Sequence, residues 1–161
     1  MQPTLTALQW ICQPFDSLTN KQVYDSINLR LTVFAFEQQV GYVDTDYRDL
    51  EAYHLLAYHG DQLVAYARLL PVGVAYEDAC SIGRVCVAAN ARKISLGKEL
   101  INKSIQHCEA LFPTTSKIKI GAQYYLLPFY EKLGFAIAGD LYYEDALPHK
   151  KMQRKNDGIC L

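Results

Sequence analysis

Apolar residues recur along this chain with helical spacing in three segments, which predict three helices. The clearest pattern lies at 96–112, where apolar side chains stand three and four positions apart and Pro113 follows to end the helix. A second pattern begins after Thr19 or Asn20 and ends near Glu37, which predicts one long helix over 20–37. A third, shorter helix is predicted at 127–133, with Gly134 at its C-terminal end.

Between the helices, short runs rich in β-branched and aromatic residues predict strands. Gly60-Asp61 joins two of them as a hairpin turn. The order of elements along the chain predicts an α/β (α+β) fold, in which helices pack on a mixed sheet. The predicted strands are 7–13, 54–59, 62–70, 80–87, 117–123, 135–138 and 150–154.

The composition is that of one ordinary domain covering residues 1–161, with 50% hydrophobic residues and a net charge of −1. A nearly neutral chain lacks the excess of Lys and Arg that general nucleic-acid binding needs, so we expect no nucleic-acid partner. No apolar run approaches the about 18 residues that cross a bilayer, and no signal peptide is visible at the N-terminus. We therefore expect a cytoplasmic protein that does not bind membranes.

Neither the cysteines nor the histidines form a metal-binding pattern, so no metal site is predicted. The five cysteines include no CxxC pair, and four of them stand in apolar surroundings. We interpret them as buried thiols rather than nucleophiles. His54 and His59 share one predicted strand at odd spacing and should face opposite sides of it.

A basic turn before the helix at 96–112 is a candidate anion site. The first N–H groups of a helix have no partner within it, and the helix dipole favours an anion beside them. Arg92, Lys93 and Lys98 add positive charge around this end. The alternative is an exposed basic turn with no ligand. Dinucleotide, phosphate-loop, GxSxG and HExxH motifs are absent from the sequence.

A tyrosine in the third predicted helix is a candidate acid. Tyr130 is followed by Gly134 and Phe135, and a phenol with its ordinary pKa near about 10 holds a proton that it can donate at neutral pH. The alternative is that Tyr130 is one more packed aromatic side chain.

Taken in order, these segments resemble the GNAT superfamily of acetyl-CoA-dependent N-acetyltransferases over almost the whole chain. Arg92-x-x-Ser95-x-Gly97 after a strand is similar to the family's acyl-CoA motif, Arg/Gln-x-x-Gly-x-Gly/Ala, and Tyr130-x-x-x-Gly134-Phe135 is similar to its next motif. Ser95 departs from the usual glycine, and a residue with a Cβ tolerates positive φ less readily. We expect this departure to affect loop geometry and CoA affinity.

Within the superfamily, the sequence looks like the ElaA-like group. Seven short matches in one order carry this narrower resemblance: Arg30-x-x-Val33-Phe34-x-x-Glu37-Gln38, Tyr42-x-Asp44-x-Asp46, His54, Ala65-Tyr66-Ala67-Arg68, Ile82-Gly83-Arg84-Val85, Gly121-Ala122-Gln123 and Glu144-Asp145-x-Leu147-Pro148-His149.

The resemblance implies a mostly antiparallel sheet of about six or seven strands with about four helices, splayed at the acyl-CoA site. Acetyl-CoA would be the co-substrate. Its pantetheine would lie along the open edge of the predicted strand at 80–87, and its pyrophosphate on the loop at 92–98 that follows this strand. A backbone N–H of the strand would stabilise the oxyanion, and Tyr130 would protonate the departing thiolate. The implied cofactor-binding residues are Val85, Cys86, Val87, Arg92, Lys93, Ser95, Leu96, Gly97 and Lys98.

The acceptor would be a small-molecule or peptide amine, and its binding residues are less well specified. Glu37, Tyr42, His54, Glu144 and His149 are candidates on resemblance and residue type, with Glu37 preferred as the base. Alternatively, Glu37 pairs with Arg30 or Arg84, and His149 closes a turn. The loop at 38–52 carries Asp44, Asp46 and Asp49 and either attracts a cationic amine or is simply solvated.

Two other classes of function remain open, and a homodimer is compatible with the sequence. One is a catalytically idle module that binds and senses acyl-CoA; the intact Tyr130 argues against it. The other is an interaction protein without a cofactor; the basic helix start argues against that.

Overall fold

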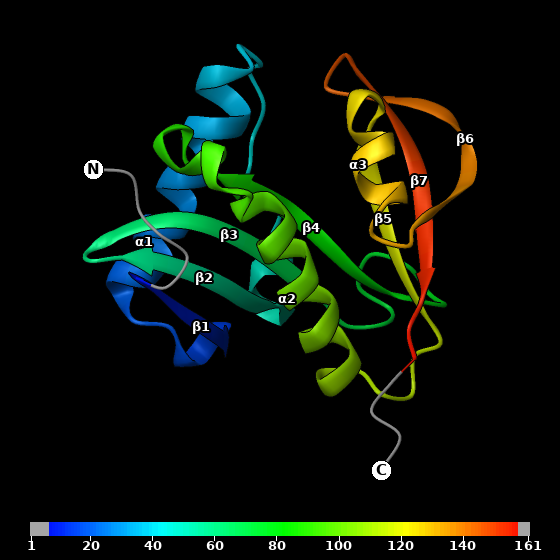
Figure 1. Ribbon diagram of the computed structural model, residues 1–161, viewed down its shortest axis with the longest axis horizontal. Coiled ribbons are helices and arrows are strands. Elements are labelled where there is room, and N and C mark those ends of the chain that lie inside the picture. The colour runs from blue at the N-terminus through cyan, green and yellow to red at the C-terminus, as the bar shows by residue number, and fades with distance from the viewer. Residues whose placement is uncertain (1–6, 158–161) are drawn as a thin grey trace.

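One mixed sheet of seven strands forms the centre of the protein (Figure 1). The computed structural model describes residues 7–157, without the side chains of Lys93 and Ile94. The strand order in the sheet is β1-β2-β3-β4-β5-β7-β6, and every neighbouring pair is antiparallel except β4 with β5. The strands are β1 (Leu8–Pro14), β2 (Tyr53–His59), β3 (Gln62–Leu70), β4 (Cys80–Val87), β5 (Lys117–Gln123), β6 (Ala136–Glu144) and β7 (Leu147–Lys155).

Helices lie on both faces of this sheet, with α2 in front of β3 and β4 in Figure 1 and α1 behind them. The predicted fold class and the mostly antiparallel sheet are thereby confirmed, although the described residues form three α-helices where about four were expected. The helical elements are α1 (Asn20–Arg30), α2 (Leu96–Leu111) and α3 (Leu127–Glu131), with the shorter segments η2 (Phe15–Ser17), η3 (Leu31–Glu37), η4 (Arg48–Glu51), η5 (Ala89–Ile94) and η6 (Tyr124–Leu126). Within residues 7–157, no helix combines the length and the apolar character needed to cross a membrane.

The first helix begins where predicted and then changes its winding. Thr19 caps α1, because its hydroxyl accepts the Gln22 N–H while the Gln22 side chain accepts the Thr19 N–H. From Leu31 to Glu37 the chain continues as a wider π-helix, where the sequence predicts one unbroken α-helix. The Thr32 hydroxyl donates to the Asn28 carbonyl at this junction. Single π turns are common at functional sites, and this one ends at the candidate base Glu37.

The second helix supplies most of the packing against β3 and β4. Its apolar stripe is buried as the spacing predicts, and the helix ends just before Pro113. The buried members of the stripe are Leu96, Leu100, Ile101, Ile105 and Cys108.

The third helix is shorter than predicted and ends at Glu131. Gly134 takes φ +90°, a conformation that L side chains rarely adopt. The Phe135 N–H then donates to the Tyr130 carbonyl. This turn brings the chain from α3 directly into β6.

The last hairpin is longer than predicted, because β6 and β7 each span nine residues. Asp145 and Ala146 make its tight turn with positive φ of 48° and 65°. Neither is a glycine, so the sequence carries little sign of the turn.

Candidate active site

The parallel neighbours β4 and β5 pair only at their N-terminal ends. Their partners are Cys80 with Ile118 and Ser81 with Lys119. Beyond Ser81 the two strands diverge toward the top of Figure 1, as the resemblance predicts for the acyl-CoA site. Within the described residues, 82–87 of β4 therefore have strand pairing on the β3 side only. An exposed strand edge can bind an extended molecule that carries amide groups.

The loop after β4 leads into α2 with the geometry of an anion site. Ser95 takes φ 58° and ψ 23° and caps α2 without a side-chain hydrogen bond. The N–H groups of the first turn thus have no side-chain cap. Lys98 is exposed beside them. Ser95 occupies the left-handed conformation that glycine adopts more readily than a residue with a Cβ.

The side chains of three predicted cofactor-binding residues are not free to contact a ligand. Leu96 and Cys86 are buried in the core, so only their backbone can meet a ligand. Arg92 is already partnered: its Nε donates to the Val87 carbonyl at 3.0 Å, and its Nη2 pairs with the Glu37 carboxylate. The Lys93 side chain lies outside the described part of the chain.

The start of α2 lies close to α3. A Cβ built on Gly97 would come within 3.9 Å of the Phe129 ring, which is ordinary contact distance. The next residue, Tyr130, is 7% exposed and packs edge-on against Phe129 and Phe135. The segment predicted to hold pyrophosphate and the helix that carries the candidate acid are therefore neighbours.

Burial keeps the Tyr130 phenol protonated. Removal from water, with a smaller contribution from Tyr125, raises the pKa of Tyr130 to about 12. The group therefore holds its proton throughout the neutral range. A donor is available at this position, although it is a weaker acid than an exposed phenol.

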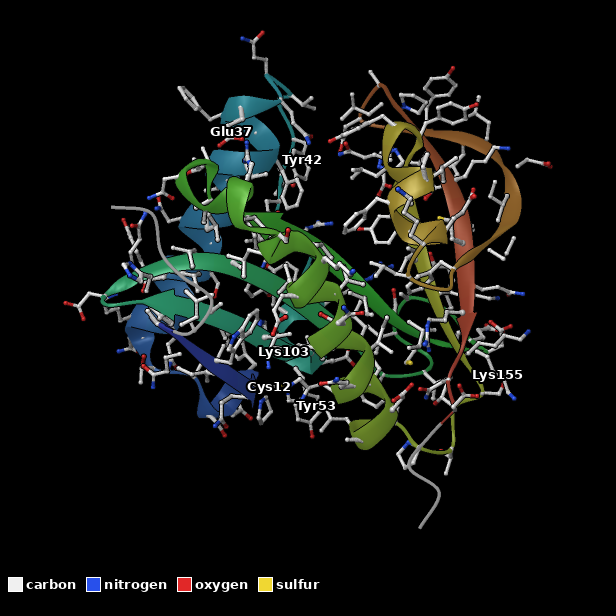
Figure 2. All side chains as sticks on the ribbon, viewed as in Figure 1. Cys12, Glu37, Tyr42, Tyr53, Lys103 and Lys155 are labelled. Carbon is white, nitrogen blue, oxygen red and sulfur yellow. The ribbon has the colours of Figure 1, made fainter. Side chains whose placement is uncertain are left out.

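Glu37 and Tyr42 lie together on the opposite side of the diverging strands from α3 (Figure 2). Glu37 pairs with Arg92, rather than with Arg30 or Arg84 as considered from the sequence. The Tyr42 hydroxyl donates to the Asp44 carboxylate at 2.9 Å. Burial, followed by the nearby Asp44 charge, raises the pKa of Tyr42 above its ordinary value.

The acidic loop at 38–52 exposes many of its side chains, but its three aspartates are paired with arginines. Each of its three aspartates pairs with one or more of three arginines that are themselves buried or half-buried. These ion pairs are Arg30–Asp44 at 2.8 Å, Arg30–Asp49 at 3.0 Å, Arg68–Asp46 at 2.7 Å, Arg68–Asp49 at 2.9 Å and Arg84–Asp44 at 3.0 Å. The formal charges of the three arginines and three aspartates cancel, which argues against attraction of a cationic amine by these aspartates.

The pairing also shows in the titration of Asp46. Partial burial acts to raise the pKa of Asp46, but hydrogen bonds and charge from Arg68, with charge from Arg84, outweigh it and lower the pKa to about 2. The loop is thereby fixed to the sheet by charged hydrogen bonds.

His54 belongs to the same buried region and not to an accessible surface. Its Nδ1 lies 2.7 Å from the Tyr66 hydroxyl, and its Nε2 lies 2.9 Å from the Asp49 carbonyl. Burial lowers the pKa of His54, so the ring is neutral near pH 7. With both nitrogens in use, His54 is a structural residue, and we omit it from the acceptor site proposed below.

Glu144 and His149 meet at the β6–β7 turn. Nδ1 of His149 lies 2.8 Å from the Leu147 carbonyl, which closes the turn in the way the sequence alternative described. Its Nε2 lies 3.7 Å from the exposed Glu144 carboxylate. Tyr142 lies beside the His149 ring and reaches over β5, where its hydroxyl would be 2.4 Å from a Cβ on Gly121. Gly121 is therefore needed for this close approach.

Sequence reasoning missed one polar contact that joins the two sides of the site. The Gln123 amide at the end of β5 lies 3.5 Å from the Gln38 side chain, which follows η3. Both residues occur in the matches to the ElaA-like group, but no chemical pattern in the sequence marked them.

The described cysteines are buried or half-buried, as predicted, but their thiols differ in acidity, because a hydrogen bond with Cys108 lowers the pKa of Cys80. Cys80, Cys86 and Cys108 are buried, and Cys12 is half-buried. Burial raises the pKa of Cys12 to about 11 and that of Cys86 further. Cys160 lies outside the described residues.

A cavity of about 730 Å³ shares the lining residue Glu37 with the candidate site. It is bounded by α1, the β2–β3 turn and residues 88–90. Two of its three carboxylates, Asp25 and Glu37, are already paired with Lys21 and Arg92; the third is Asp61. We assign it no ligand.

Comparison with known proteins identifies the class to which this fold and site belong. The sequence model of the acetyltransferase (GNAT) domain matches residues 18–156, and the chain belongs to this family. The family predicted from the motifs is thus confirmed. Membership supports acyl-CoA-dependent N-acyltransferase activity on amine acceptors in general.

Within the family, the narrower resemblance to ElaA is also confirmed. Protein ElaA of Escherichia coli is 35% identical over 150 residues, which cover 92% of this chain and 97% of ElaA. A UPF0039 protein of Schizosaccharomyces pombe is 33% identical over 150 residues, covering 92% and 98% of the two chains.

Solved structures agree with these sequence matches. The crystal structure of E. coli ElaA superimposes with a TM-score of 0.85 at 34% identity, covering 91% of this chain and 99% of that one. An acyl-CoA N-acyltransferase from Pseudomonas aeruginosa gives 0.84 at 36% identity and the same coverage. A GNAT acetyltransferase from Elizabethkingia anophelis, solved with acetyl-CoA bound, shares the fold at 14% identity and a TM-score of 0.62.

Proposed function

We propose that this protein transfers an acetyl group from acetyl-CoA directly to an amine acceptor, within a single domain that spans residues 1–161. The observation that carries the proposal is the unpaired edge of β4 beside the first turn of α2. An extended amide-bearing thioester and its pyrophosphate both fit this combination. The fold neighbour that holds acetyl-CoA supports the choice of co-substrate.

In this proposal the backbone binds most of acetyl-CoA. The pantetheine amides pair with the edge at 85–87, and the pyrophosphate lies on the N–H groups of residues 95–98, near the Lys98 charge. Arg92 contributes to pyrophosphate binding only if its guanidinium exchanges its contact with Glu37. Lys93 stays a proposed contributor on charge alone.

The chemical step is a direct attack of the neutral amine on the thioester carbonyl. The nitrogen–carbon bond forms as negative charge grows on the carbonyl oxygen, which accepts a hydrogen bond from a backbone N–H of β4. The carbon–sulfur bond then breaks, and Tyr130 donates its proton to the CoA sulfur. The ammonium proton leaves to a base, which restores neutral Tyr130 directly or through water. An acetyl-cysteine intermediate is not part of this proposal, because burial keeps the Cys86 thiol protonated and the thiolate is the nucleophilic form.

We propose Glu37 as that base. It is partly accessible, lies on the side of the diverging strands opposite α3 and is held by Arg92. Tyr42, on the same side as Glu37, and Glu144 and His149, at the β6–β7 turn, are proposed acceptor contacts. The acidic loop contributes no net charge, so the proposal does not require a polycationic acceptor.

A second function, an idle module that senses acyl-CoA, is favoured by two observations. Glu37 is already paired with Arg92, and His54 is buried. A module without a free base would bind acetyl-CoA and release no CoA.

Two measurements separate these functions. A thermal-shift scan with acetyl-CoA, CoA and no ligand tests binding, because a ligand bound only to the native state raises its stability. Free-thiol release is then followed with acetyl-CoA and a panel of diamines, amino acids, aromatic amines and peptide N-termini. Amine-dependent release supports transfer. Binding without release with any amine indicates the sensor, and no thermal shift contradicts both functions.

A further inference from the structure

β4 contains one extra residue at the point where it separates from β5. Arg68 of β3 pairs with Gly83, and Tyr66 pairs with Cys86, so β3 advances by two residues while β4 advances by three. The extra residue lies at Arg84–Val85 and forms a β-bulge. Arg84 takes φ 49° there, the left-handed conformation that glycine favours.

This bulge decides which way the backbone of Val85 points. Ala88 donates its N–H to the Val64 carbonyl at 2.8 Å. Because hydrogen-bonding direction alternates along an antiparallel strand, Val85 and Val87 face the unpaired edge. The Val87 carbonyl accepts from Arg92, outside the ladder, in agreement with this direction. Without the extra residue, Val85 would pair with Tyr66 and its N–H would be used within the sheet.

The side chain of Arg84 ties the bulge to the acidic loop. Its Nε donates to Oδ1 of Asp44 at 3.0 Å, and its Nη2 donates to the Asp44 backbone carbonyl at 2.9 Å. The guanidinium also lies 5.9 Å from the centre of the Tyr42 ring. Two directed hydrogen bonds to one residue fix both the position and the plane of the guanidinium.

Asp44 is in turn held rigidly. It is 2% exposed, and its Oδ2 lies 2.8 Å from Nη2 of Arg30, the buried last residue of α1. The Tyr42 hydroxyl donates to its Oδ1. The chain of contacts from Arg30 through Asp44 to Arg84 therefore connects α1 to the bulged segment of β4.

We propose that Arg84 and Asp44 are positioning residues for acyl transfer: their contact holds the left-handed bulge that presents the Val85 N–H to the thioester oxygen. The inference rests on the proposed function. Neither side chain touches the reacting atoms, so loss of the contact should lower kcat more than acetyl-CoA affinity. Displacing one oxyanion donor costs on the order of 10- to 100-fold in rate, less than removing it.

A pair of substitutions at position 84 tests this. Arg84→Ala removes the tether and leaves a residue that resists positive φ, whereas Arg84→Gly removes the same tether but accepts positive φ freely. The side chain is 22% exposed, so both variants should fold. We expect kcat for Arg84→Ala to fall on the order of 10-fold or more, with acetyl-CoA affinity changed by less than about 3-fold, and Arg84→Gly to recover a clear part of the loss.

Asp44→Asn should resemble Arg84→Ala in kcat, provided that thermal melting shows it folded. Asp46→Asn is the matched control. It removes the charge of a loop carboxylate that lies farther from Arg84, at 3.6 Å, and it leaves the Asp44–Arg84 hydrogen bonds intact. Unchanged kcat in Arg84→Ala, or equal losses in the Ala and Gly variants, would overturn the inference alone. A wild-type protein that transfers acetyl to no amine would overturn the proposed function and this inference with it.

Discussion

Arg92 and Glu37, 55 positions apart in the sequence, form an ion pair in which the guanidinium also bonds the Val87 carbonyl. One side chain thus connects the loop proposed for pyrophosphate, the end of β4 and the residue proposed as the base. In the proposed complex, Arg92 would therefore divide its contacts between the pyrophosphate and Glu37.

Replacement of Glu37 by Gln should separate turnover from cofactor binding. The loss of the base should lower kcat by about 10²–10⁴, whereas acetyl-CoA affinity should stay the same or rise, because Arg92 is released toward the phosphates. Steady-state kinetics and calorimetry measure the two effects, with the exposed loop residue Glu77→Gln as control. Full activity in Glu37→Gln would remove this residue from the mechanism.

Tyr130→Phe should fold normally and bind acetyl-CoA nearly as well as wild type, because only a hydroxyl is lost. Its kcat should fall by roughly 10²–10⁴, the usual effect of one positioned acid. Single-turnover rates should be compared as well, since slow product release can hide a chemical defect. Tyr125→Phe, at a side chain that is 71% exposed, is the matched control. A wild-type single-turnover rate in Tyr130→Phe would show that Tyr130 is a packing residue and not the acid.

Gly97→Asp should abolish most of the affinity for CoA by placing a carboxylate beside the pyrophosphate. Gly97→Ala is the control that isolates charge from size, because its Cβ meets only the Phe129 ring at 3.9 Å. We expect the alanine variant to bind CoA within about 3-fold of wild type, since contact at that distance is unstrained. Calorimetry on both folded proteins gives the comparison. Equal affinities for the Asp and Ala variants would place the phosphates elsewhere.

Ser95→Gly should stabilise the protein by about 0.5–1 kcal/mol. A left-handed conformation costs an L residue about 1–2 kcal/mol, and the greater freedom of glycine in the unfolded chain offsets part of the gain. Ser95 makes no side-chain cap that would be lost. Urea unfolding of the two proteins measures the difference. A lower midpoint for Ser95→Gly would show that the hydroxyl contributes more than the backbone conformation costs.

Stability should decline as the pH falls below about 6.5, because burial lowers the pKa of His54 in the folded protein from its ordinary 6.5. Below pH 6.5 the unfolded chain binds a proton at His54 that the native state does not bind, so the free energy of unfolding decreases. This decrease continues until the pH reaches the pKa of the folded state, and there is none above pH 7. His107 acts in the same direction. His54→Gln should be less stable at pH 8 but should show a flatter dependence between pH 7 and 5. Urea midpoints that fall in parallel for the two proteins would assign the effect to other groups.

The sequence predicted elements well where apolar spacing and caps agree. The α2 stripe and the Thr19 cap of α1 are examples. It failed on the β6–β7 hairpin, because Gly139 and Asp140 interrupt the strand pattern and the Asp145–Ala146 turn lacks the usual glycine. The exposed side chains of β6 also leave it without an alternating pattern.

The site was predictable only where a motif describes backbone geometry. The positive φ of Ser95 follows from a position that is usually glycine. The partners of Asp44 and Glu37 did not follow, because Arg84 and Arg92 reach them from segments about 40 and 55 residues away. Hydrophobic periodicity predicts on which face of a helix or strand a side chain lies, but it does not predict which charged residue from a distant segment will pair with it.

The short parallel contact between β4 and β5 makes the sheet mechanically uneven. Four antiparallel strands on one side and three on the other form stiff ladders, and only two residue pairs, Cys80–Ile118 and Ser81–Lys119, join them. A small rotation about this seam would widen or narrow the distance between the diverging ends without breaking either ladder. The width of the opening would then be set at one end of β4 and β5, by the two residue pairs, and not by pairing along the opening itself.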